Sequence, residues 1–323
     1  MPHYTHSEGI KTLNDLGASK TPFLFIISYD KQNIFASPLD QLDDDIFYKL
    51  DRQRNFASLP IRKPYYFTKN PIDFKLYKES FDKVIEEIKS GNTYLLNLTF
   101  RTPIESDLNL YEIFCASKAK YKLYFKGKFI CFSPEKFISI EDNTISTYPM
   151  KGTIDASLPN AAQQILANEK EMAEHTMIVD LMRNDLGIVA NNIKVERFRY
   201  IDSIKAGEQR LLQVSSHITG KLSHNWYMQT GNILDSLTPA GSISGTPKKK
   251  TIDIIDEIEN YNREWYTGIF GIYDGSSLHS AVIIRYIGEE NGILYYKSGG
   301  GITLDSDIKS EYEEMVRKIY LPF

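Results

Sequence analysis

Lys151 is the residue whose type and position most directly suggest covalent chemistry. It lies at the end of a predicted apolar strand, two residues after Pro149 and directly before Gly152. A lysine amine is a nucleophile near neutral pH only when burial or a nearby cation lowers its pKa. Most lysines are solvated and do no chemistry. A catalytic role for Lys151 therefore depends on other groups that could act with it.

Glu135 is the first such group. It lies in the segment Phe132-Ser133-Pro134-Glu135, at the predicted junction of two hairpins, upstream of Lys151. The two residues could therefore lie on adjacent strands. In that arrangement Glu135 would be an acid and Lys151 a nucleophile.

Three charged residues share one face of the predicted C-terminal helix. Glu311, Glu314 and Lys318 follow one another at i, i+3 and i+7. The ordinary interpretation is a solvated face with a Glu314–Lys318 pair. The alternative is that the two carboxylates bind Mg²⁺, which needs few protein carboxylates, and that Lys318 receives an anion beside it.

The glycine run Gly299-Gly300-Gly301 lies between a predicted strand and this helix. Its backbone N–H groups could bind an anion, although a tight turn is an equal alternative. Glu174, on a largely apolar helix face, is either a paired core carboxylate or a metal ligand. His175 beside it is expected to be structural, because no HExxH pattern is present. Arg285 follows four apolar residues and needs a partner, for which a carboxylate is suitable.

The composition is that of an ordinary globular protein. The 323 residues are 42% hydrophobic and 25% charged, and the net charge of −4 argues against binding to nucleic acid or to a membrane surface. The two cysteines, Cys115 and Cys131, form no disulfide framework or metal motif. No apolar run reaches membrane-spanning length and no signal segment is recognisable. We therefore expect a cytoplasmic protein.

The elements that must position these groups alternate between hairpins and helices. We predict strands at 22–28, 93–101 and 210–222, hairpins at 122–132 and 137–147, and an antiparallel meander over 268–296. Helices are predicted at 76–90, 161–185 (closed by Gly187), 252–258 and after Asp305-Ser306-Asp307, and the acidic segment 40–51 is predicted to be a surface helix or loop. Hairpins with helices between them favour an α+β fold with large antiparallel sheets, in one compact domain.

The ordered set of motifs resembles the chorismate-utilising enzymes, which include anthranilate synthases, aminodeoxychorismate synthases, and isochorismate and salicylate synthases. The similar segments are SPEKF (133–137), PMKGT (149–153), AEHTMIVDLMRNDLG (173–187), PAGSISGTPK (239–248), WYTGIFG (265–271), VIIRY (282–286) and SGGGI…DSD…EYEEMVRK (298–318). Each motif alone is ordinary, but their order over about residues 75–320 is specific.

This resemblance implies the fold of the anthranilate synthase large component, a sandwich of two antiparallel sheets with flanking helices. Residues 1–74 would be a shortened N-terminal part and residues 75–323 the chorismate-binding region. The resemblance also implies Mg²⁺ as cofactor, held by Glu174 and Glu314 with Glu311 nearby. Ring-carboxylate binding would fall to Gly299, Gly300, Gly301 and Lys318, enolpyruvyl-carboxylate binding to Arg285 and Tyr266, and the wall of the ring pocket to Thr246.

Lys151 indicates which member the chain resembles most. Anthranilate synthases typically have alanine at this position, whereas component I of aminodeoxychorismate synthase has the lysine of a PIKGT motif. In those enzymes the lysine is thought to add at C2 while Glu135's counterpart protonates the departing C4 hydroxyl, and ammonia then attacks C4. The resemblance therefore implies amination of chorismate to 4-amino-4-deoxychorismate for p-aminobenzoate and folate, with ammonia from a separate glutaminase subunit.

Two departures bear on this assignment. The isochorismate and salicylate synthases have a lysine base where this chain has Leu95, and aminodeoxychorismate synthases often have glutamine there. Anthranilate synthases have a histidine where this chain has Gln213. An anthranilate synthase component and a catalytically silent chorismate-binding subunit remain the alternatives.

Overall fold

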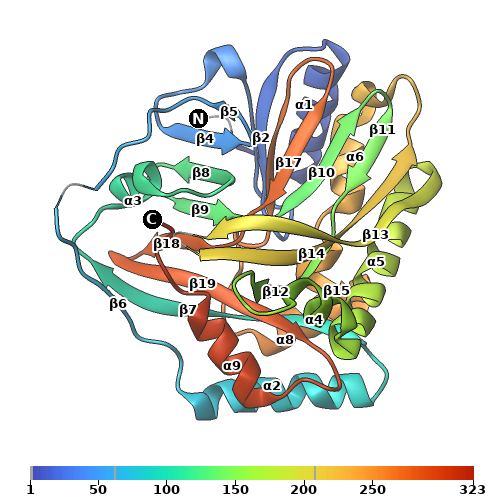
Figure 1. Cartoon of the computed structure of the whole chain (residues 1–323). Coiled ribbons are helices and arrows are strands. Elements are labelled where there is room, and N and C mark those ends of the chain that lie inside the picture. The colour runs from blue at the N-terminus through green and yellow to red at the C-terminus, as the bar shows by residue number, and fades with distance from the viewer. Residues whose placement is uncertain (1–2, 62, 207–208) are drawn as a thin grey trace.

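Two antiparallel β-sheets form the centre of the molecule. The computed structural model describes residues 3–61, 63–206 and 209–323. Within these residues one sheet has ten strands and the other nine, and helices cover their outer surfaces (Figure 1). The predicted α+β sandwich is thereby confirmed.

The ten-stranded sheet, here called sheet A, contains the first strands of the chain and the strand that carries Lys151. Its order is β1 (His3–Tyr4), β3 (Ile34–Pro38), β2 (Phe23–Ile27), β16 (Ile269–Tyr273), β17 (Leu278–Val282), β10 (Lys136–Glu141), β11 (Thr144–Thr147), β14 (Gln209–Lys221) and β12 (Met150–Asp155), with β13 (Asn191–Ala206) paired to β14.

The nine-stranded sheet, sheet B, contains the glycine run. Its order is β15 (Gly245–Thr246), β7 (Leu95–Ser106), β19 (Ile293–Ile302), β18 (Tyr286–Glu290), β9 (Phe129–Ser133), β8 (Tyr121–Phe125), β4 (Ile46–Leu50) and β5 (Gln53–Arg54), with β6 (Phe67–Lys69) paired to β7.

The helices form separate groups on the outer faces of the two sheets. Figure 1 shows α2, α8 and α9 beside β7 and β19 of sheet B, and α1, α5 and α6 beside sheet A. The bounds are α1 (His6–Ala18), η1 (Leu39–Gln41), α2 (Phe74–Lys89), α3 (Leu110–Ala116), α4 (Ala161–Ala167), α5 (Glu169–Val189), η2 (Trp226–Gln229), α6 (Thr230–Leu237), α7 (Gly241–Ser244), α8 (Lys248–Ile258) and α9 (Ile308–Arg317). In the part of the chain described, no helix is both long and apolar enough to cross a lipid bilayer.

Strand β2 explains why the sequence at the centre of sheet A is a continuous run of apolar residues. Successive side chains of a strand point to opposite faces. Leu24 and Ile26 pack in the core between the sheets, whereas Phe23, Phe25 and Ile27 pack under the helices on the other face. The strand is therefore buried on both sides, as its sequence predicted.

The helices of sheet B follow their predicted patterns. Helix α2 buries Tyr77, Phe81, Val84 and Ile88 and begins after Asp73, whose carboxylate accepts a hydrogen bond from the Lys75 N–H at 2.8 Å. Helix α9 begins after Asp307, which caps the N–H of Ser310 in the same way. Both starts are set by an acidic N-cap.

Two helix predictions are wrong in their boundaries. The segment predicted as one helix over 161–185 is two helices, because Asn168 is extended between them and caps α5 by accepting from the Glu171 N–H. Gly187 does not close the helix, since α5 continues to Val189. In segment 40–51, residues 40–45 are the end of η1 and a loop, as expected, but residues 46–50 form strand β4, because Ile46, Tyr48 and Leu50 alternate into the core.

The predicted meander over 268–296 is also wrong in its topology. Strands β16 and β17 pair in sheet A, whereas β18 and β19 pair in sheet B. The chain thus passes from one sheet to the other between Val282 and Tyr286. Local sequence cannot distinguish this passage from a turn, because both join two apolar strands.

Lys151 lies inside strand β12 rather than at the end of a strand. Because β11 and β14 separate β12 from β10, the prediction that Lys151 and Glu135 lie on adjacent strands is wrong. Strands β11 and β12 both pair with β14, with Thr147 opposite Ile218 and Met150 opposite Ser215. They therefore run along β14 with a short interruption at Tyr148 and Pro149. The division at residue 74 remains a prediction; strands from both sides of that residue occur in both sheets.

Two helical glycines provide a test of this packing. A Cβ on Gly231 of α6 would lie 2.3 Å from the backbone oxygen of Ile10 in α1, whereas a Cβ on Gly187 would have no atom within 4 Å. We expect Gly231→Ala to lower the free energy of unfolding by about 2 kcal/mol. Gly187→Ala should be neutral or stabilising by up to about 1 kcal/mol, because alanine favours helix.

Chemical denaturation of both variants beside the parent chain measures these differences. Equal stability of the two variants would contradict the close contact between α1 and α6.

Candidate active site

The candidate site lies where two neighbouring chain segments pass between the sheets. One leaves β9 at Ser133 and enters β10 at Lys136; the other leaves β17 at Val282 and enters β18 at Tyr286. Backbone hydrogen bonds join the two passages, from Val282 N–H to Glu135 oxygen at 3.2 Å and from Phe132 N–H to Arg285 oxygen at 3.1 Å. Glu135 and Arg285 are thereby brought together at this crossing.

A cleft opens beside the crossing. Its lining consists of Asn97, Glu135, Ser242, Ile243, Tyr266, Ile284, Arg285, Lys297, Ser298, Gly299, Gly300, Gly301 and Lys318. Most of the predicted substrate-binding residues are therefore in one place. The other lining residues had not been predicted as site residues. Ser242 and Ile243 lie within the segment PAGSISGTPK, but the resemblance assigned a role there only to Thr246.

Glu135 is a partly buried carboxyl group in the cleft wall. Ser242 Oγ donates a hydrogen bond to its Oε1 at 2.5 Å. Burial raises the pKa of Glu135, and the Ser242 hydrogen bond and the Lys318 charge offset this only in part. The protonated acid therefore persists to a higher pH than is usual for glutamate.

Arg285 and Tyr266 supply donors on the same side of the cleft. Arg285 has a left-handed backbone conformation, with φ of 53°, directly before β18 begins at Tyr286. Its Nη1 donates to the backbone oxygen of Lys318 at 3.2 Å. Burial raises the pKa of Tyr266, so its hydroxyl remains a neutral donor.

The glycine run is strand rather than loop. Gly299, Gly300 and Gly301 end β19 and pair with β7 along one edge. Along the other edge β18 pairs with β19 only from Ile293 to Lys297. Cβ atoms on Gly300 and Gly301 would make only ordinary contacts, the nearest at 3.5 and 3.9 Å. The missing side chains thus leave an open surface on this part of the cleft.

Lys318 lies between this glycine strand and helix α9. Its Nζ donates to the Gly299 oxygen at 2.8 Å and pairs with Glu314 at 2.8 Å. Burial lowers the pKa of Lys318 despite the opposing effect of Glu314. Burial acts to raise the pKa of Glu314, but Lys318 outweighs it and the pKa is lowered. The predicted Glu314–Lys318 pair is therefore present, with the Lys318 side chain 27% exposed and the Glu314 side chain 50% exposed.

Lys151 is also held by a carboxylate. Its Nζ lies 2.6 Å from Oε2 of Glu174, whose side chain is 8% exposed. Burial acts to lower the pKa of Lys151, but Glu174 and the neighbouring glutamates outweigh it and raise the pKa. The sequence argument asked for a lysine with a lowered pKa, so Glu174 must be engaged elsewhere before Lys151 can react as an amine.

Helices α5 and α9 together present four glutamates around these lysines. Glu171 was not predicted; it precedes Glu174 by one helical turn, and its Oε2 is buried with no hydrogen-bond partner. Burial raises the pKa of Glu311 and of Glu171. Such hard oxygen donors are the type that Mg²⁺ prefers. Among the described residues, however, no three acidic, histidine or cysteine side chains converge as a ready-made metal site.

Two other predicted residues lie outside this arrangement. Thr246 is in β15, where its oxygen accepts from the Tyr94 N–H, and it is not among the residues lining the cleft. Burial lowers the pKa of His175 to about 4, and its Nε2 is bonded to Ser216 at 2.7 Å. A neutral, buried imidazole agrees with the structural role expected for His175.

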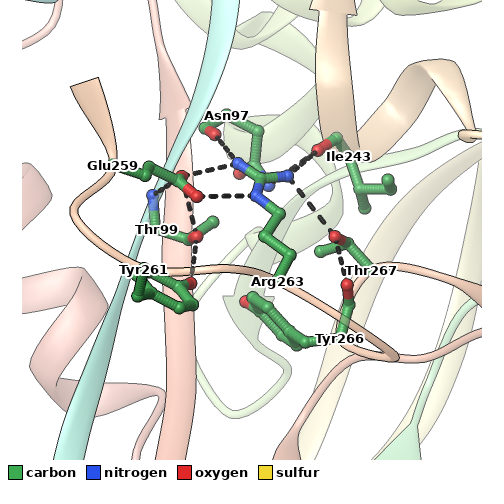
Figure 2. A network of polar contacts seen from close by, with 8 residues as sticks. All are labelled: Asn97, Thr99, Ile243, Glu259, Tyr261, Arg263, Tyr266 and Thr267. Carbon is green, nitrogen blue, oxygen red and sulfur yellow. Dashed lines mark hydrogen bonds and ion pairs between the residues drawn. The ribbon is translucent and has the colours of Figure 1, made fainter. Parts of the chain in front are cut away.

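A buried ion pair supports the cleft from beneath. Glu259 and Arg263 are each 2% exposed, and their side chains join at 2.6 and 2.8 Å (Figure 2). Glu259 also accepts from the N–H and hydroxyl of Thr99 in β7. Sequence could have suggested this pair only through its spacing of four residues.

Arg263 links three segments of the cleft wall. It donates to the backbone oxygens of Asn97 at 2.6 Å and Ile243 at 3.1 Å, and to the hydroxyl of Thr267 at 3.4 Å (Figure 2). Thr267 in turn donates to the backbone oxygen of Tyr266. Asn97, Ile243 and Tyr266 all line the cleft, so one guanidinium group holds them together.

Comparison with known proteins gives a consistent picture. Residues 30–322 match the sequence model of a family described as chorismate binding enzyme. An uncharacterised PabA-like protein of Haemophilus influenzae is 49% identical over 100% of this chain and 98% of its own length. Aminodeoxychorismate synthase component 1 of Salmonella typhimurium is 31% identical over 95% of this chain and 69% of its own.

A solved structure supports the fold. Anthranilate synthase component I from Streptococcus pneumoniae superposes with a TM-score of 0.71, covering 92% of this chain and 79% of that chain at 21% identity.

The buried pair predicts a large effect on stability. Arg263→Met would leave Glu259 as an uncompensated buried charge, and we expect a loss of about 3–5 kcal/mol in the free energy of unfolding. Glu313 and Arg317 form a matched control, since they have the same spacing but are 68% and 69% exposed. Arg317→Met should change stability by less than about 0.5 kcal/mol. Denaturant titration of both variants makes the comparison; similar losses would contradict the special role of Arg263.

Proposed function

The chain belongs to the chorismate-binding enzyme family, and from this we propose that it is an aminodeoxychorismate synthase component 1. It would transfer ammonia nitrogen to C4 of chorismate, giving 4-amino-4-deoxychorismate for p-aminobenzoate and folate synthesis. The observation that carries the proposal is Lys151, which occupies the position of the lysine in the PIKGT motif and lies 2.6 Å from Glu174, next to the acidic helices.

The cleft offers separate donors for the two carboxylates of chorismate. Arg285 and Tyr266 would bind the enolpyruvyl carboxylate, since a guanidinium and a neutral phenol both donate hydrogen bonds to it. Lys318 and the N–H groups of Gly299–Gly301 would bind the ring carboxylate. Thr246 would approach the ring from β15, as the family resemblance implies.

The chemistry proceeds through a covalent adduct on Lys151. The amine of Lys151 forms a bond to C2 while the ring double bond shifts and the C4 hydroxyl leaves as water. The amine reacts in its neutral form, and the lysine nitrogen then carries the positive charge as a secondary ammonium, so it can leave as the neutral amine in the next step. Ammonia then attacks C4, the double bond shifts back, and the Lys151–C2 bond breaks.

Glu135 would supply the proton to the departing hydroxyl. A general acid must be protonated at the pH of the reaction, and burial raises the pKa of Glu135 in the required direction. Its place in the same cleft as Arg285 and Tyr266 supports this role.

Magnesium would be held by Glu174 and Glu314, with Glu311 and Glu171 nearby. The chemical type of these donors fits Mg²⁺, which uses one or two carboxylates and completes its coordination with water and substrate. When bound, Mg²⁺ supplies positive charge opposite the ring carboxylate. Glu174 and Glu314 are each paired with a lysine, so metal binding would compete with those ion pairs.

The residues at two other positions favour amination at C4 over the related reactions. Leu95 packs beside Gly301 and cannot activate water, which disfavours isochorismate formation. Gln213 lies in β14 opposite Thr153 and cannot transfer a proton as the histidine of anthranilate synthases does. Ammonia would come from a separate glutaminase subunit, as the resemblance implies.

The reaction product tests the proposal directly. With chorismate, Mg²⁺ and an ammonium salt, the purified chain should form 4-amino-4-deoxychorismate, identified by chromatography and mass spectrometry. Glutamine should not replace ammonium unless a glutaminase is added. Anthranilate or isochorismate as the sole product would refute the assignment.

In the same assay Lys151→Ala should slow amination roughly 100-fold or more, because the nucleophile is lost. Lys170→Ala is the matched control, since Lys170 also approaches Glu174, at 3.9 Å, but its side chain is 48% exposed. We expect the control to retain most of its activity. Without ammonia, wild-type protein should show a chorismate-derived adduct on Lys151 by mass spectrometry.

Metal binding can be measured without turnover. We expect Glu174→Gln and Glu314→Gln each to weaken Mn²⁺ binding, followed by electron paramagnetic resonance, by about 10-fold or more. Glu313→Gln is the control, because Glu313 is exposed and pairs with Arg317 on α9. Unchanged binding in the first two variants would place the metal elsewhere.

A further inference from the structure

Ser242 lines the cleft, and neither the motifs nor the proposed function gives it a role. It lies in the four-residue helix α7, between Gly241 and Ile243. Its hydroxyl donates to Oε1 of Glu135 at 2.5 Å, and both side chains line the cleft. The contact joins segments 107 residues apart in the sequence.

The segment that carries Ser242 is fixed on both sides. On one side Gly241 fits closely against α5, where an added Cβ would lie 2.8 Å from Asp185 Oδ2 and 2.9 Å from Leu181. On the other side the backbone oxygen of Ile243 accepts from Arg263 Nη1 at 3.1 Å and from Asn97 Nδ2 at 3.0 Å. The Ser242 hydroxyl is therefore held in place before any substrate arrives.

Arg263 is itself immobilised, because Glu259 binds it through two of its nitrogens (Figure 2). An ion pair removed from water has well-defined geometry when its remaining donors are satisfied, as those of Arg263 are by Asn97 and Ile243. A continuous set of contacts thus runs from Glu259 through Arg263 and Ile243 to Ser242 and Glu135.

We propose that Ser242 is a positioning residue for Glu135, and that the Glu259–Arg263 pair holds Ser242 in place through the Ile243 oxygen. This inference rests on the proposed use of Glu135 as the acid. Because Ser242 donates to Oε1, that oxygen is an acceptor and the acidic proton is directed to Oε2. Ser242 thereby selects the oxygen that gives its proton to the substrate hydroxyl.

The arrangement also places opposing influences on the pKa of Glu135. Burial raises its pKa, while the Ser242 hydrogen bond and the charge of Lys318 lower it. An acid that is too weak transfers its proton poorly, and one that is too strong is ionised at the working pH. Ser242 moderates the effect of burial without adding a charge to the cleft.

Ser242→Ala tests the inference. We expect kcat for amination to fall about 10-fold with little change in KM for chorismate, since the lost hydrogen bond acts through Glu135. The alkaline limb of the wild-type pH profile, along which Glu135 loses its proton, should vanish in Glu135→Gln. In Ser242→Ala that same limb should move to higher pH, because the hydrogen bond that lowers the pKa of Glu135 is gone.

Two further variants separate this role from general packing. Ser242→Thr keeps the hydroxyl and should restore most of kcat and the wild-type pH limb. Ser244→Ala removes a buried hydroxyl from the same helix, one that donates to the Ala240 oxygen and not to Glu135. It should leave the pH limb in place, and thermal unfolding of each variant shows that folded protein is compared.

The role of Arg263 is tested by Arg263→Lys, which keeps the positive charge but loses the planar guanidinium group that donates to several acceptors at once. We expect kcat to fall and the Glu135 limb to move to higher pH, as in Ser242→Ala. In the double variant Ser242→Ala/Arg263→Lys, the Glu135 limb should lie where it lies in Ser242→Ala alone, since both changes reach Glu135 through one contact. Additive shifts of this limb would show that Arg263 does not act on Glu135 through Ser242.

The outcomes distinguish this inference from the proposed function. If Glu135→Gln retains wild-type turnover, the role of Glu135 as an acid fails, and the inference fails with it. If Glu135→Gln is slowed and loses its pH limb but Ser242→Ala behaves like Ser244→Ala, only the inference is overturned. A rise in KM for chorismate with unchanged kcat in Ser242→Ala would instead make Ser242 a direct substrate contact.

Discussion

The geometry of the cleft depends on a salt bridge that is almost completely removed from water. Burying Glu259 and Arg263 costs several kcal/mol per ion, and their mutual attraction offsets this only when the remaining donors and acceptors are satisfied. Here Thr99, Asn97 and Ile243 satisfy them. Asn97 and Thr99 lie in β7, whereas Ile243 lies in α7. The requirement to satisfy one buried guanidinium therefore sets the relative positions of β7, α7 and the segment before β16.

The other end of the site is built on a different principle. Lys151 and Lys318 are each held by one glutamate, and the glutamates belong to two helices that are not continuous in sequence. Their lysine side chains are 29% and 27% exposed, so these pairs exchange with water and with ligands more readily than the Glu259–Arg263 pair does. A rigid wall can orient an anionic ring. The exchangeable ion pairs beside it can open, so that their charged side chains bind the ring instead of each other.

Much of this could be predicted from sequence. The alternation of apolar residues gave α2, α9 and the strands of the core, and the ordered motifs indicated the cleft residues from Glu135 to Lys318. The errors arose where the chain changes partner without changing composition. The passage after Val282 and the interruption at Pro149 look like ordinary turns, and Asn168 looks like a helix residue until it is seen to cap α5. Ser242 and Glu171 could not be predicted because their roles depend on neighbours distant in sequence.

The crossing between the sheets explains why the acid and the arginine are together. Within a sheet, backbone hydrogen bonding and packing on both faces leave central side chains no access to a ligand, as in β2. Where two adjacent segments leave one sheet for the other, the ladder is interrupted and the backbone takes irregular conformations, such as the φ of 53° at Arg285. Glu135 and Arg285 lie at this interruption on paired segments, so each fixes the position of the other. Glu135 and Arg285 are therefore available for chemistry because the fold places them at such a corner and not within a ladder.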